Sequence, residues 1–459
     1  MSTRQTDGLP RRVGIWLAVV PVLAVGIADA TIAVRTVHSG NARAPHPRTP
    51  RVVLTQSKPS PGFFEQQDIE RANALRALLA RRAQAVLTRD RAEFLATDDP
   101  AQPRFRAQQA RAFDAMAAVP FATWSYAFDD TAPALPSLPS TLRYGATTYA
   151  PSAFELTYRI KGFDVTPNDV PQTPTFVQRN GHWYIASFSD YTSTARPTGV
   201  DIWDFGPVRT VRAPNVLVLG HPGSLALMHE IATDTSAAIP RVTAVWGRSW
   251  ARRVVVYVPA TQRELGDIVG DSGDLNQIVA LASAEVQSCP STPQPSGDRV
   301  GINPATWSTV PSVLRVAVLT HELTHVASRA DTSACTPTWL VEGFADYVGY
   351  RGLGYSAKTL SPELASDIAR GRIPTHLPTD AAFDGSSKTL GQAYEEGFLA
   401  CRLIAARWGE RTLVRFYTTV GTSRADPEVA VAHAMRTWLH MTPKAFVAAW
   451  VQYVRQQLS

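Results

Sequence analysis

Hydrophobic and polar positions follow two different periods in the first half of the chain. In AFELTYRIKG, residues 153–162, every second position from Phe154 to Ile160 is apolar, the pattern of a strand with one buried face. Upstream, apolar side chains recur at helical spacing, at Leu75, Leu78, Leu79, Ala83, Val86 and Leu87. A second helix is expected over 104–118, and an Asn-Gly pair at 180–181 suits a tight hairpin turn. Residues 63–195 are therefore predicted to form a small α+β domain of helices followed by an antiparallel sheet.

A second domain is predicted over residues 205–459. Short apolar runs at 215–220, 252–260 and 299–303 are typical of buried strands, and helices are expected between them. From residue 311 onward the apolar positions have helical spacing. Strands followed by helices predict a mostly helical domain with a small N-terminal sheet, so the fold class of the whole chain is α+β.

The N-terminus has the pattern of an export signal. Residues 1–12 are basic, and residues 13–34 are apolar without interruption up to Asp29. This length lies between a signal-peptide core and a membrane-spanning helix, so a cleaved signal peptide and an uncleaved signal-anchor both remain open. Residues 1–12 are expected to stay cytoplasmic, and the Pro/Ser-rich residues 35–62 to form an extended linker. The domains are therefore expected outside the cytoplasm, held at the cell membrane by a single pass or secreted after cleavage.

Composition argues against two kinds of site. The formal net charge is +6, with no dense basic run interleaved with aromatic residues, so nucleic-acid binding is not expected. The cysteines form no C-x-x-C pair, so a thiolate zinc site is not expected either. Cys289 and Cys335 lie in polar surroundings and are the preferred disulfide pair, whereas Cys401 lies in an apolar helical pattern and is expected to be a buried thiol.

One apolar helical pattern carries two histidines. In VLTHELTHVAS, residues 318–328, His321 and His325 are four positions apart and lie on one face of a helix, where both imidazoles can approach one ion. Glu322 is offset by one position, so it can lie beside such an ion without binding it. A catalytic zinc site needs a third protein ligand and an open position. Taken alone, the motif also fits a buried helix with two hydrogen-bonded histidines.

The segment PTWLVEGFADYVGY, residues 337–350, offers the missing carboxylates. Glu342 follows His325 by seventeen positions, which leaves room for a loop and a helix that returns antiparallel to the first. Asp346 lies four residues further on, on the same helical face. It is expected to accept a hydrogen bond from a metal-bound imidazole, that of His321. Because the surrounding residues are apolar and aromatic, these carboxylates need a partner, and the two segments together predict a metal site.

These segments resemble the gluzincin zinc metallopeptidases. HELTH followed by WLVEGFADYV is similar to the HExxH and downstream-glutamate motifs of that clan. The second segment is also similar to the WLNEGFA segment of its aminopeptidases and of related bacterial peptidases. The resemblance implies a gluzincin-like peptidase domain with zinc as cofactor, bound by His321, His325 and Glu342, and with Glu322 as the general base.

A third segment extends the resemblance. AYEEGFLACRLIAARWG, residues 393–409, is similar to the YEKGF segment of gluzincin aminopeptidases, which implies that the Tyr394 hydroxyl stabilises the oxyanion. The GxMEN segment of those aminopeptidases is absent upstream of His321. An endopeptidase acting on peptide or protein substrates therefore fits better than an aminopeptidase. RVGIN, residues 299–303, is expected from its position to be an edge strand that pairs with an extended substrate.

Two other functions remain open. The chain fits a catalytically inactive envelope binding protein with a structural zinc site, and it also fits a zinc hydrolase of non-peptide substrates. The domain at 63–195 loosely resembles the cone-shaped nuclear-transport-factor-two-like fold, with GHWYIASF as the main cue. A structural or targeting role is expected for it.

Overall fold

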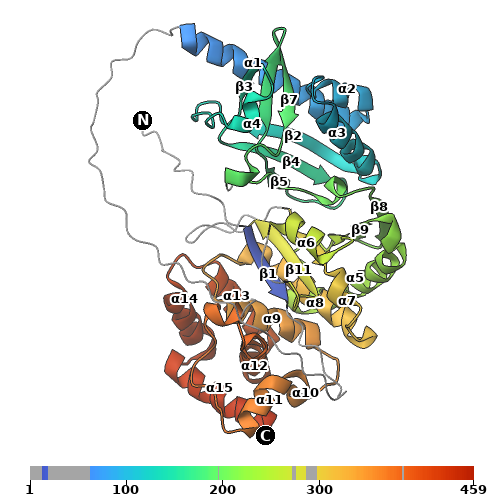
Figure 1. Ribbon diagram of the computed structural model, residues 1–459. Helices are drawn as coiled ribbons and strands as arrows, with labels where there is room; N and C mark the ends of the chain where they lie inside the picture. Colours follow the sequence, from blue (N-terminus) through green and yellow to red (C-terminus); the bar gives the residue numbers. More distant parts are fainter. Residues whose placement is uncertain (1–12, 19–62, 195, 271–274, 286–296, 385–386) are drawn as a thin grey trace, which may run out of the picture.

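Two bodies of the chain lie one against the other (Figure 1). The computed structural model describes residues 13–18 and 63–459, except 195, 271–274, 286–296 and 385–386. Residues 63–204 form the first body, blue to green in Figure 1, and the residues after 205, green to red, form the second body together with the blue strand at residues 13–18. The mixed α+β class predicted from the sequence is confirmed.

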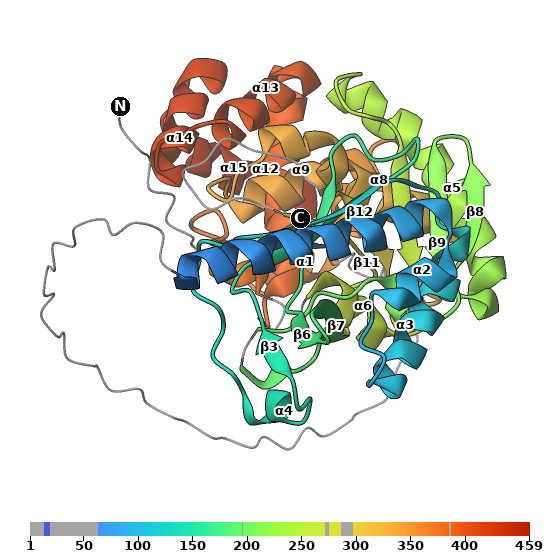
Figure 2. The ribbon, with the colours of Figure 1, turned by 90° about the horizontal axis from the view of Figure 1, so that it is seen from above.

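In the first body, helices precede antiparallel strands. The helices are α1 (Phe63–Thr88), α2 (Arg91–Ala96), α3 (Pro103–Ala115) and the short α4 (Pro139–Leu142). The strands are β2 (Phe121–Phe128), β3 (Thr147–Tyr149), β4 (Phe154–Ile160), β5 (Asn168–Pro171), β6 (Thr175–Arg179) and β7 (His182–Ser187). They form one sheet in the order β2-β4-β5 and another in the order β3-β6-β7. Figures 1 and 2 show α1 along the outer side of this body, away from the second.

The predicted local patterns of the first body are confirmed. Every second residue of β4, from Phe154 to Ile160, is buried, and those between are partly exposed. Asn180 and Gly181 join β6 to β7 with φ of 51° and 79°, the positive values that a tight hairpin turn requires. Helix α3 and the 3-10 turn after it cover the helix expected over 104–118.

The second body begins with a six-stranded sheet in the order β1-β11-β12-β10-β9-β8. Its strands are β1 (Val13–Ala18), β8 (Arg209–Ala213), β9 (Val216–Gly220), β10 (Val254–Val258), β11 (Ala280–Glu285) and β12 (Arg299–Ile302). Strand β10 is parallel to β9 and β12, whereas β11 is antiparallel to β12. The expectation that residues 299–303 form an edge strand is wrong, because β11 pairs along the outer side of β12.

Two helices of the second body lie between strands of the sheet, and the others follow its last strand. They are α5 (Leu225–Trp246), α6 (Gln262–Val269), α7 (Pro304–Trp307), α8 (Ser312–Ser328), α9 (Thr338–Tyr350), α10 (Ala357–Leu360), α11 (Pro362–Ala369), α12 (Leu390–Trp408), α13 (Glu410–Gly421), α14 (Pro427–Ala434) and α15 (Pro443–Leu458). The helical spacing expected from residue 311 onward is confirmed. Helix α15 shows how such a helix begins, because the Thr442 hydroxyl accepts from the Ala445 N–H at 3.2 Å and Pro443 fills the first turn.

The two bodies share a hydrophobic core across the sheet. Val216 and Val218 of β9 pack with the helices of the second body, whereas Leu217 and Leu219 pack with aromatic residues of the first. Both faces of β9 and β10 are therefore buried, which explains their continuous apolar sequences VLVLG and VVVYV.

The segment predicted to export the chain falls mostly outside the described residues. Residues 13–18, its first part, form β1 and pair antiparallel with β11. Among the described residues, no helix combines the length and the apolar character needed to cross a membrane. Whether residues 13–34 act as a signal peptide or as a signal-anchor stays a prediction.

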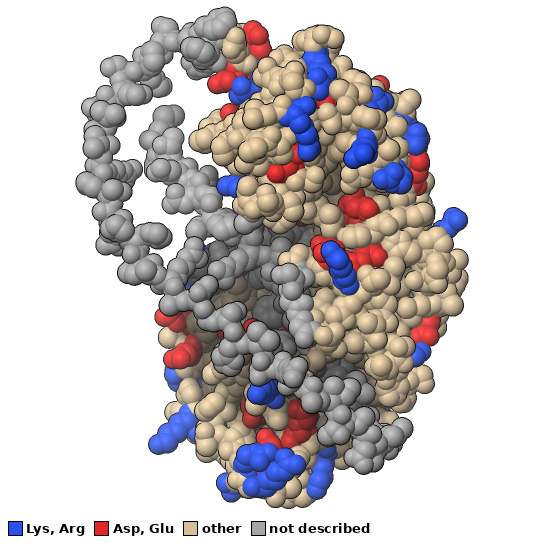
Figure 3. Space-filling view, in the orientation of Figure 1, with Lys and Arg blue, Asp and Glu red and all other residues tan. Residues whose placement is uncertain are grey.

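Charges and cysteines add two observations. On the face shown in Figure 3, the described lysine and arginine side chains form separate patches, several of them beside acidic side chains. Cys401 is free and buried on α12, as expected. Cys335 is disulfide-bonded, and Cys289, its predicted partner, lies outside the described residues.

Candidate metal centre

Helix α8 buries both histidines at the centre of the second body. Its apolar side chains pack against α5 and the sheet, so the middle of the helix is enclosed. His321 and His325 are each 2% exposed, and their Nε2 atoms lie 3.0 Å apart. The two imidazoles therefore point at one spot, as the four-residue spacing predicts.

Helix α9 brings a carboxylate to the same spot. Glu342 Oε2 lies 3.3 Å from His321 Nε2 and 3.5 Å from His325 Nε2. The ligand atoms of the three side chains all lie within 4.8 Å of one another. The structure thus brings together the three residues that the sequence singles out as metal ligands.

Glycines allow the backbone of α9 to pack closely against the backbones of α8 and α12. A Cβ on Gly343 would lie 2.2 Å from the carbonyl oxygen of Gly397 on α12. A Cβ on Gly349 would lie 3.0 Å from the carbonyl oxygen of Ala317 on α8. Because glycine has no Cβ, the backbones touch directly, and Glu342, next to Gly343, is held against the histidines.

Asp346 contacts the far side of one imidazole. Its Oδ1 atom lies 2.8 Å from His321 Nδ1, and both side chains are buried. Because a carboxylate only accepts, His321 donates the Nδ1–H here and directs its Nε2 towards Glu342. This is the contact expected from the position of Asp346, one helical turn after Glu342.

Glu322 lies on α8 between the two histidines in sequence and is fully buried. Neither of its carboxylate oxygens has a hydrogen-bond partner among the described residues. A buried carboxyl group without a hydrogen-bond partner costs free energy.

Burial and mutual contacts separate the pKa values of these groups in the metal-free protein. Burial raises the pKa of Glu322 to about 8. Burial acts in the same direction on Glu342, but His325 and His321 outweigh it and lower the Glu342 pKa to about 2. Burial lowers the pKa of His325. For His321, burial is outweighed by the Asp346 and Glu342 carboxylates, so its pKa lies well above the usual value.

The three side chains fit a zinc ion. Two imidazole nitrogens and one carboxylate oxygen are the ligands of many catalytic zinc sites, in which a fourth position stays open. Glu342 Oε2 is buried and makes no hydrogen bond in the described structure, although two imidazole nitrogens face it. An ion bound between these atoms would satisfy all three, so His321, His325 and Glu342 form a group that can hold zinc.

Tyr394 lies on α12, the helix that contacts α9 through the glycine pair. It is 2% exposed, and its ring packs edge-on against Phe383 with the ring centroids 5.2 Å apart. The next residue, Glu395, accepts hydrogen bonds from the backbone N–H groups of Glu363 and Leu364, which ties α12 to α11. The role of the Tyr394 hydroxyl stays a prediction.

Some buried side chains around the site were not predicted. Arg329, just after α8, donates to Asp298 at 3.0 Å, and the Tyr417 hydroxyl bonds to hydroxyl groups at the end of α8. The Tyr350 hydroxyl on α9 is buried with no hydrogen-bond partner in the described structure. Tyr350 lies one helical turn after Asp346, so the helical spacing of this segment could have singled it out from the sequence. Asp298 and Tyr417 are distant in sequence, and no pattern points to them.

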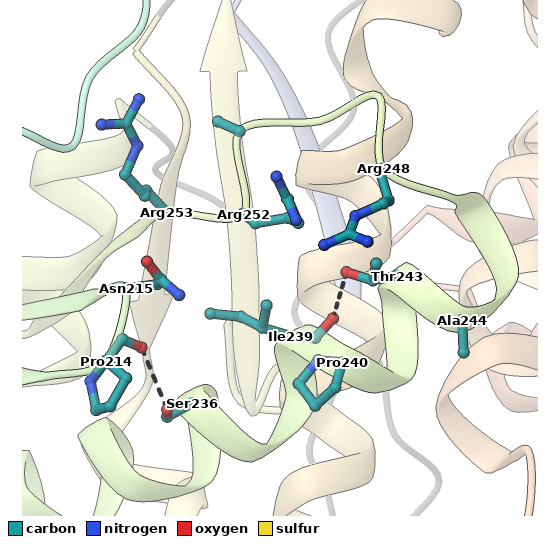
Figure 4. Close-up of a pocket in the computed structure, with 11 residues that line it drawn as sticks. Pro214, Asn215, Ser236, Ile239, Pro240, Thr243, Ala244, Arg248, Arg252 and Arg253 are labelled. Carbon is teal, nitrogen blue, oxygen red and sulfur yellow. Dashed lines mark hydrogen bonds between the residues drawn. The ribbon is translucent and has the colours of Figure 1, made fainter.

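A surface hollow of about 950 Å³ lies elsewhere, between α5 and the start of β10 (Figure 4). Arg248, Arg252 and Arg253 surround it, and Ile239 and Pro240 line its helical side. None of the residues that line this hollow belongs to the metal group. The hollow is therefore a separate feature of the surface.

Comparison with known proteins gives structural neighbours at low similarity. No family model and no curated protein sequence matches the chain. The crystal structure of an M1 zinc metallopeptidase from Deinococcus radiodurans is 15% identical and has a TM-score of 0.33, with 72% of this chain and 70% of that chain covered. A two-domain M1 zinc metallopeptidase mutant bound to L-arginine is also 15% identical with a TM-score of 0.33, with 67% of this chain and 61% of that chain covered.

These neighbours are gluzincin-clan zinc metallopeptidases, the clan that the sequence motifs resemble. The chain spans 61% of the length of the L-arginine-bound structure. At this similarity the likeness carries no argument about individual residues, so the assignment of the metal group rests on its geometry. The resemblance of the first body to the nuclear-transport-factor-two-like fold finds no support in these comparisons and stays a prediction.

Proposed function

We propose that this chain is a zinc-dependent peptidase. The proposal depends on one observation: Glu322, a buried carboxyl group with no hydrogen-bond partner in the described structure, interacts electrostatically with His321 and Glu342 of the group formed by His321, His325 and Glu342. A purely structural zinc site has no use for such a carboxyl group, which costs free energy while it is unpartnered. This favours a hydrolytic enzyme over a binding protein with a structural zinc site.

In the proposed mechanism each residue has one task. His321, His325 and Glu342 would hold zinc, which when bound lowers the pKa of water towards about 7 and polarises a carbonyl group. Asp346 keeps the His321 ring in the orientation that presents Nε2. Glu322 accepts the proton of the attacking water and delivers it to the leaving amine nitrogen. Tyr394 donates a hydrogen bond to the oxyanion as negative charge develops on it.

The outer edge of β11 supports a peptide as the substrate. Residues 13–18 pair antiparallel with residues 280–285 along this edge, so its backbone groups can bind an extended chain, and a peptide substrate would take the place of residues 13–18. The edge lies next to α8, the helix that carries the histidines. We favour an endopeptidase, because the segment that holds a substrate amino group in gluzincin aminopeptidases is absent upstream of His321.

The test is a mixed-peptide digest with the wild-type chain and the Glu322→Gln variant, read by mass spectrometry. The wild type should cleave internal bonds and stop when a chelator removes zinc. The variant should bind one zinc ion yet lose at least about 100-fold of the turnover, because a general base contributes about 10²–10⁴-fold. Glu428→Gln, an exposed position on α14, is the matched control and should behave like the wild type.

Two results would count against the proposal. Turnover by Glu322→Gln at the wild-type rate would remove the assigned base. Release of single N-terminal residues, with internal bonds left intact, would show an aminopeptidase instead of an endopeptidase.

A further inference from the structure

The outer strand of the sheet in the second body comes from the N-terminal part of the chain. Strand β1 pairs antiparallel with the whole of β11, from Val13 opposite Glu285 to Ala18 opposite Ala280. It is the end strand on this side of the sheet. Without β1, strand β11 would present a row of unpaired backbone N–H and C=O groups, the feature that an added strand recognises.

The edge that β1 covers lies beside the helix of the metal group. Helix α8, which carries His321 and His325, contacts both β1 and β11. Figure 1 shows these two strands side by side. At the end of α8, Arg329 donates from Nη2 to the Ala282 carbonyl oxygen of β11 at 3.4 Å. Arg329 follows His325 by one helical turn, so β11 is tied to α8 close to a proposed zinc ligand.

Only one segment at a time can occupy this edge. Strand β1 uses the backbone groups of β11 that an extended substrate would use in the proposed function. The pairing is intramolecular, so its effective concentration does not fall when the protein is diluted. A substrate therefore binds only those molecules in which β1 has left the edge, and its apparent affinity is reduced in proportion to that fraction.

We propose that residues 13–18 are an autoinhibitory strand that covers the substrate edge of the peptidase. The inference rests on the proposed function and concerns access to the same site. The strand competes for backbone hydrogen bonds and leaves the metal group intact, because His321, His325 and Glu342 lie on α8 and α9 and not on the paired strands. It therefore raises KM and leaves kcat unchanged.

The same residues begin the predicted export segment, residues 13–34. A segment that crosses a bilayer as a helix cannot pair with β11 as a strand, because its backbone groups bond within the helix. A cleaved segment is no longer tethered beside the edge. Either of the two predicted fates of the segment would therefore uncover β11, and the strand would restrain the chain before export.

Kinetics of the full zinc-loaded chain test the proposal. Prolines at Ile15 and Trp16 remove two neighbouring N–H groups, one of which faces β11 in an antiparallel ladder. Ile15→Pro/Trp16→Pro should lower the KM for a peptide substrate at least about fivefold, as expected if the edge is free in about a fifth of wild-type molecules. The kcat should not change. Ile15→Val/Trp16→Tyr is the matched control, because these residues favour strands, and its KM should equal that of the wild type.

Hydrogen exchange gives a readout that does not need turnover. Without substrate, amide groups at residues 280–285 should exchange faster in the proline variant than in the control. In the Glu322→Gln chain, a saturating peptide substrate should speed exchange at residues 13–18, because the displaced strand loses its partner. This second measurement keeps β1 unaltered, so it decides the question if the proline variant fails to fold.

The autoinhibitory strand and the peptidase fail in different ways. Absence of turnover in every chain with an intact Glu322 would overturn the peptidase and this inference with it. Turnover with the same KM in the proline variant and the control would overturn the autoinhibitory strand alone. So would exchange at residues 13–18 that a saturating peptide does not change.

Discussion

At the scale of single residues, two buried glutamates beside the histidines differ in their surroundings. Glu342 faces both imidazoles, and its pKa is lowered to about 2, whereas burial raises the pKa of Glu322 to about 8. The imidazoles therefore favour the charged form of Glu342, as a metal ligand requires, whereas burial disfavours the charged form of Glu322.

Asp346 offers a test of the imidazole orientation. Asp346→Asn removes the carboxylate that accepts the His321 Nδ1–H, so the ring is less well oriented and less basic. Zinc affinity should fall about 10- to 100-fold, the usual effect of losing such a partner. Competition with a chromogenic chelator measures it. Asp68→Asn, at an exposed position on α1, is the control. Equal zinc affinity in Asp346→Asn and the wild type would mean that this contact does not support the ligand.

At the scale of elements, the site depends on how closely three helices pack. Helix α9 touches α12 through Gly343 and Gly397 and touches α8 through Gly349. Gly343 lies in VEGFA, beside Glu342, and Gly397 lies in EEGF, about one turn after Tyr394; both segments are similar to peptidase motifs. Their contribution is therefore steric: they set the distance between the helices that carry the proposed ligands and the tyrosine.

Gly397→Ala should consequently destabilise the fold. Its Cβ would lie 2.7 Å from the Trp339 carbonyl oxygen, which forces the helices apart. Overpacking lowers the free energy of unfolding by about 1–3 kcal/mol. The better helix propensity of alanine raises it by about 1 kcal/mol at most. Denaturant unfolding should show a net loss of stability, and zinc affinity should fall. Gly223→Ala has nothing within 4 Å of its new Cβ and should be neutral. A Gly397→Ala variant as stable as Gly223→Ala would contradict the steric role.

Local sequence patterns predicted most elements and the metal group, but not the arrangement of the sheet. Continuous apolar runs indicated β9 and β10, and strict alternation indicated β4. Strand β11 was missed because ALASAE consists mostly of small residues with no strong apolar period. The interior position of β12 could not be predicted, because strand order depends on pairings between residues far apart in sequence.

At the scale of the whole molecule, the first body and the second are joined by a buried ion pair as well as by apolar packing. Arg299 of β12 bonds to both oxygens of Asp164 in the first body, at 2.8 Å and 2.9 Å. Its Nε atom donates to the Tyr257 hydroxyl of β10, which contacts the Tyr158 hydroxyl of β4. The sheet that supports α8 is therefore anchored to the first body.

Asp164→Asn tests this junction. The side chains of Arg299 and Asp164 are 6% and 5% exposed, so the variant leaves a buried guanidinium without its charge partner. Breaking a buried pair in this way costs about 3–5 kcal/mol. Urea unfolding should show a loss of this size, and Asp114→Asn, which breaks the exposed pair with Arg91, should have only a small effect. Equal losses of unfolding free energy in Asp164→Asn and Asp114→Asn would mean that the pair of Arg299 with Asp164 does not hold the two bodies together.

X-ray absorption at the zinc edge of the zinc-loaded chain tests the central claim most directly. One zinc ion per chain should show two imidazole nitrogens and carboxylate or water oxygens at about 2.0–2.2 Å, and no sulfur. The Glu342→Ala variant should lose an oxygen ligand and bind zinc more weakly. Sulfur scattering at about 2.3 Å, or a spectrum unchanged by Glu342→Ala, would contradict a site built from His321, His325 and Glu342.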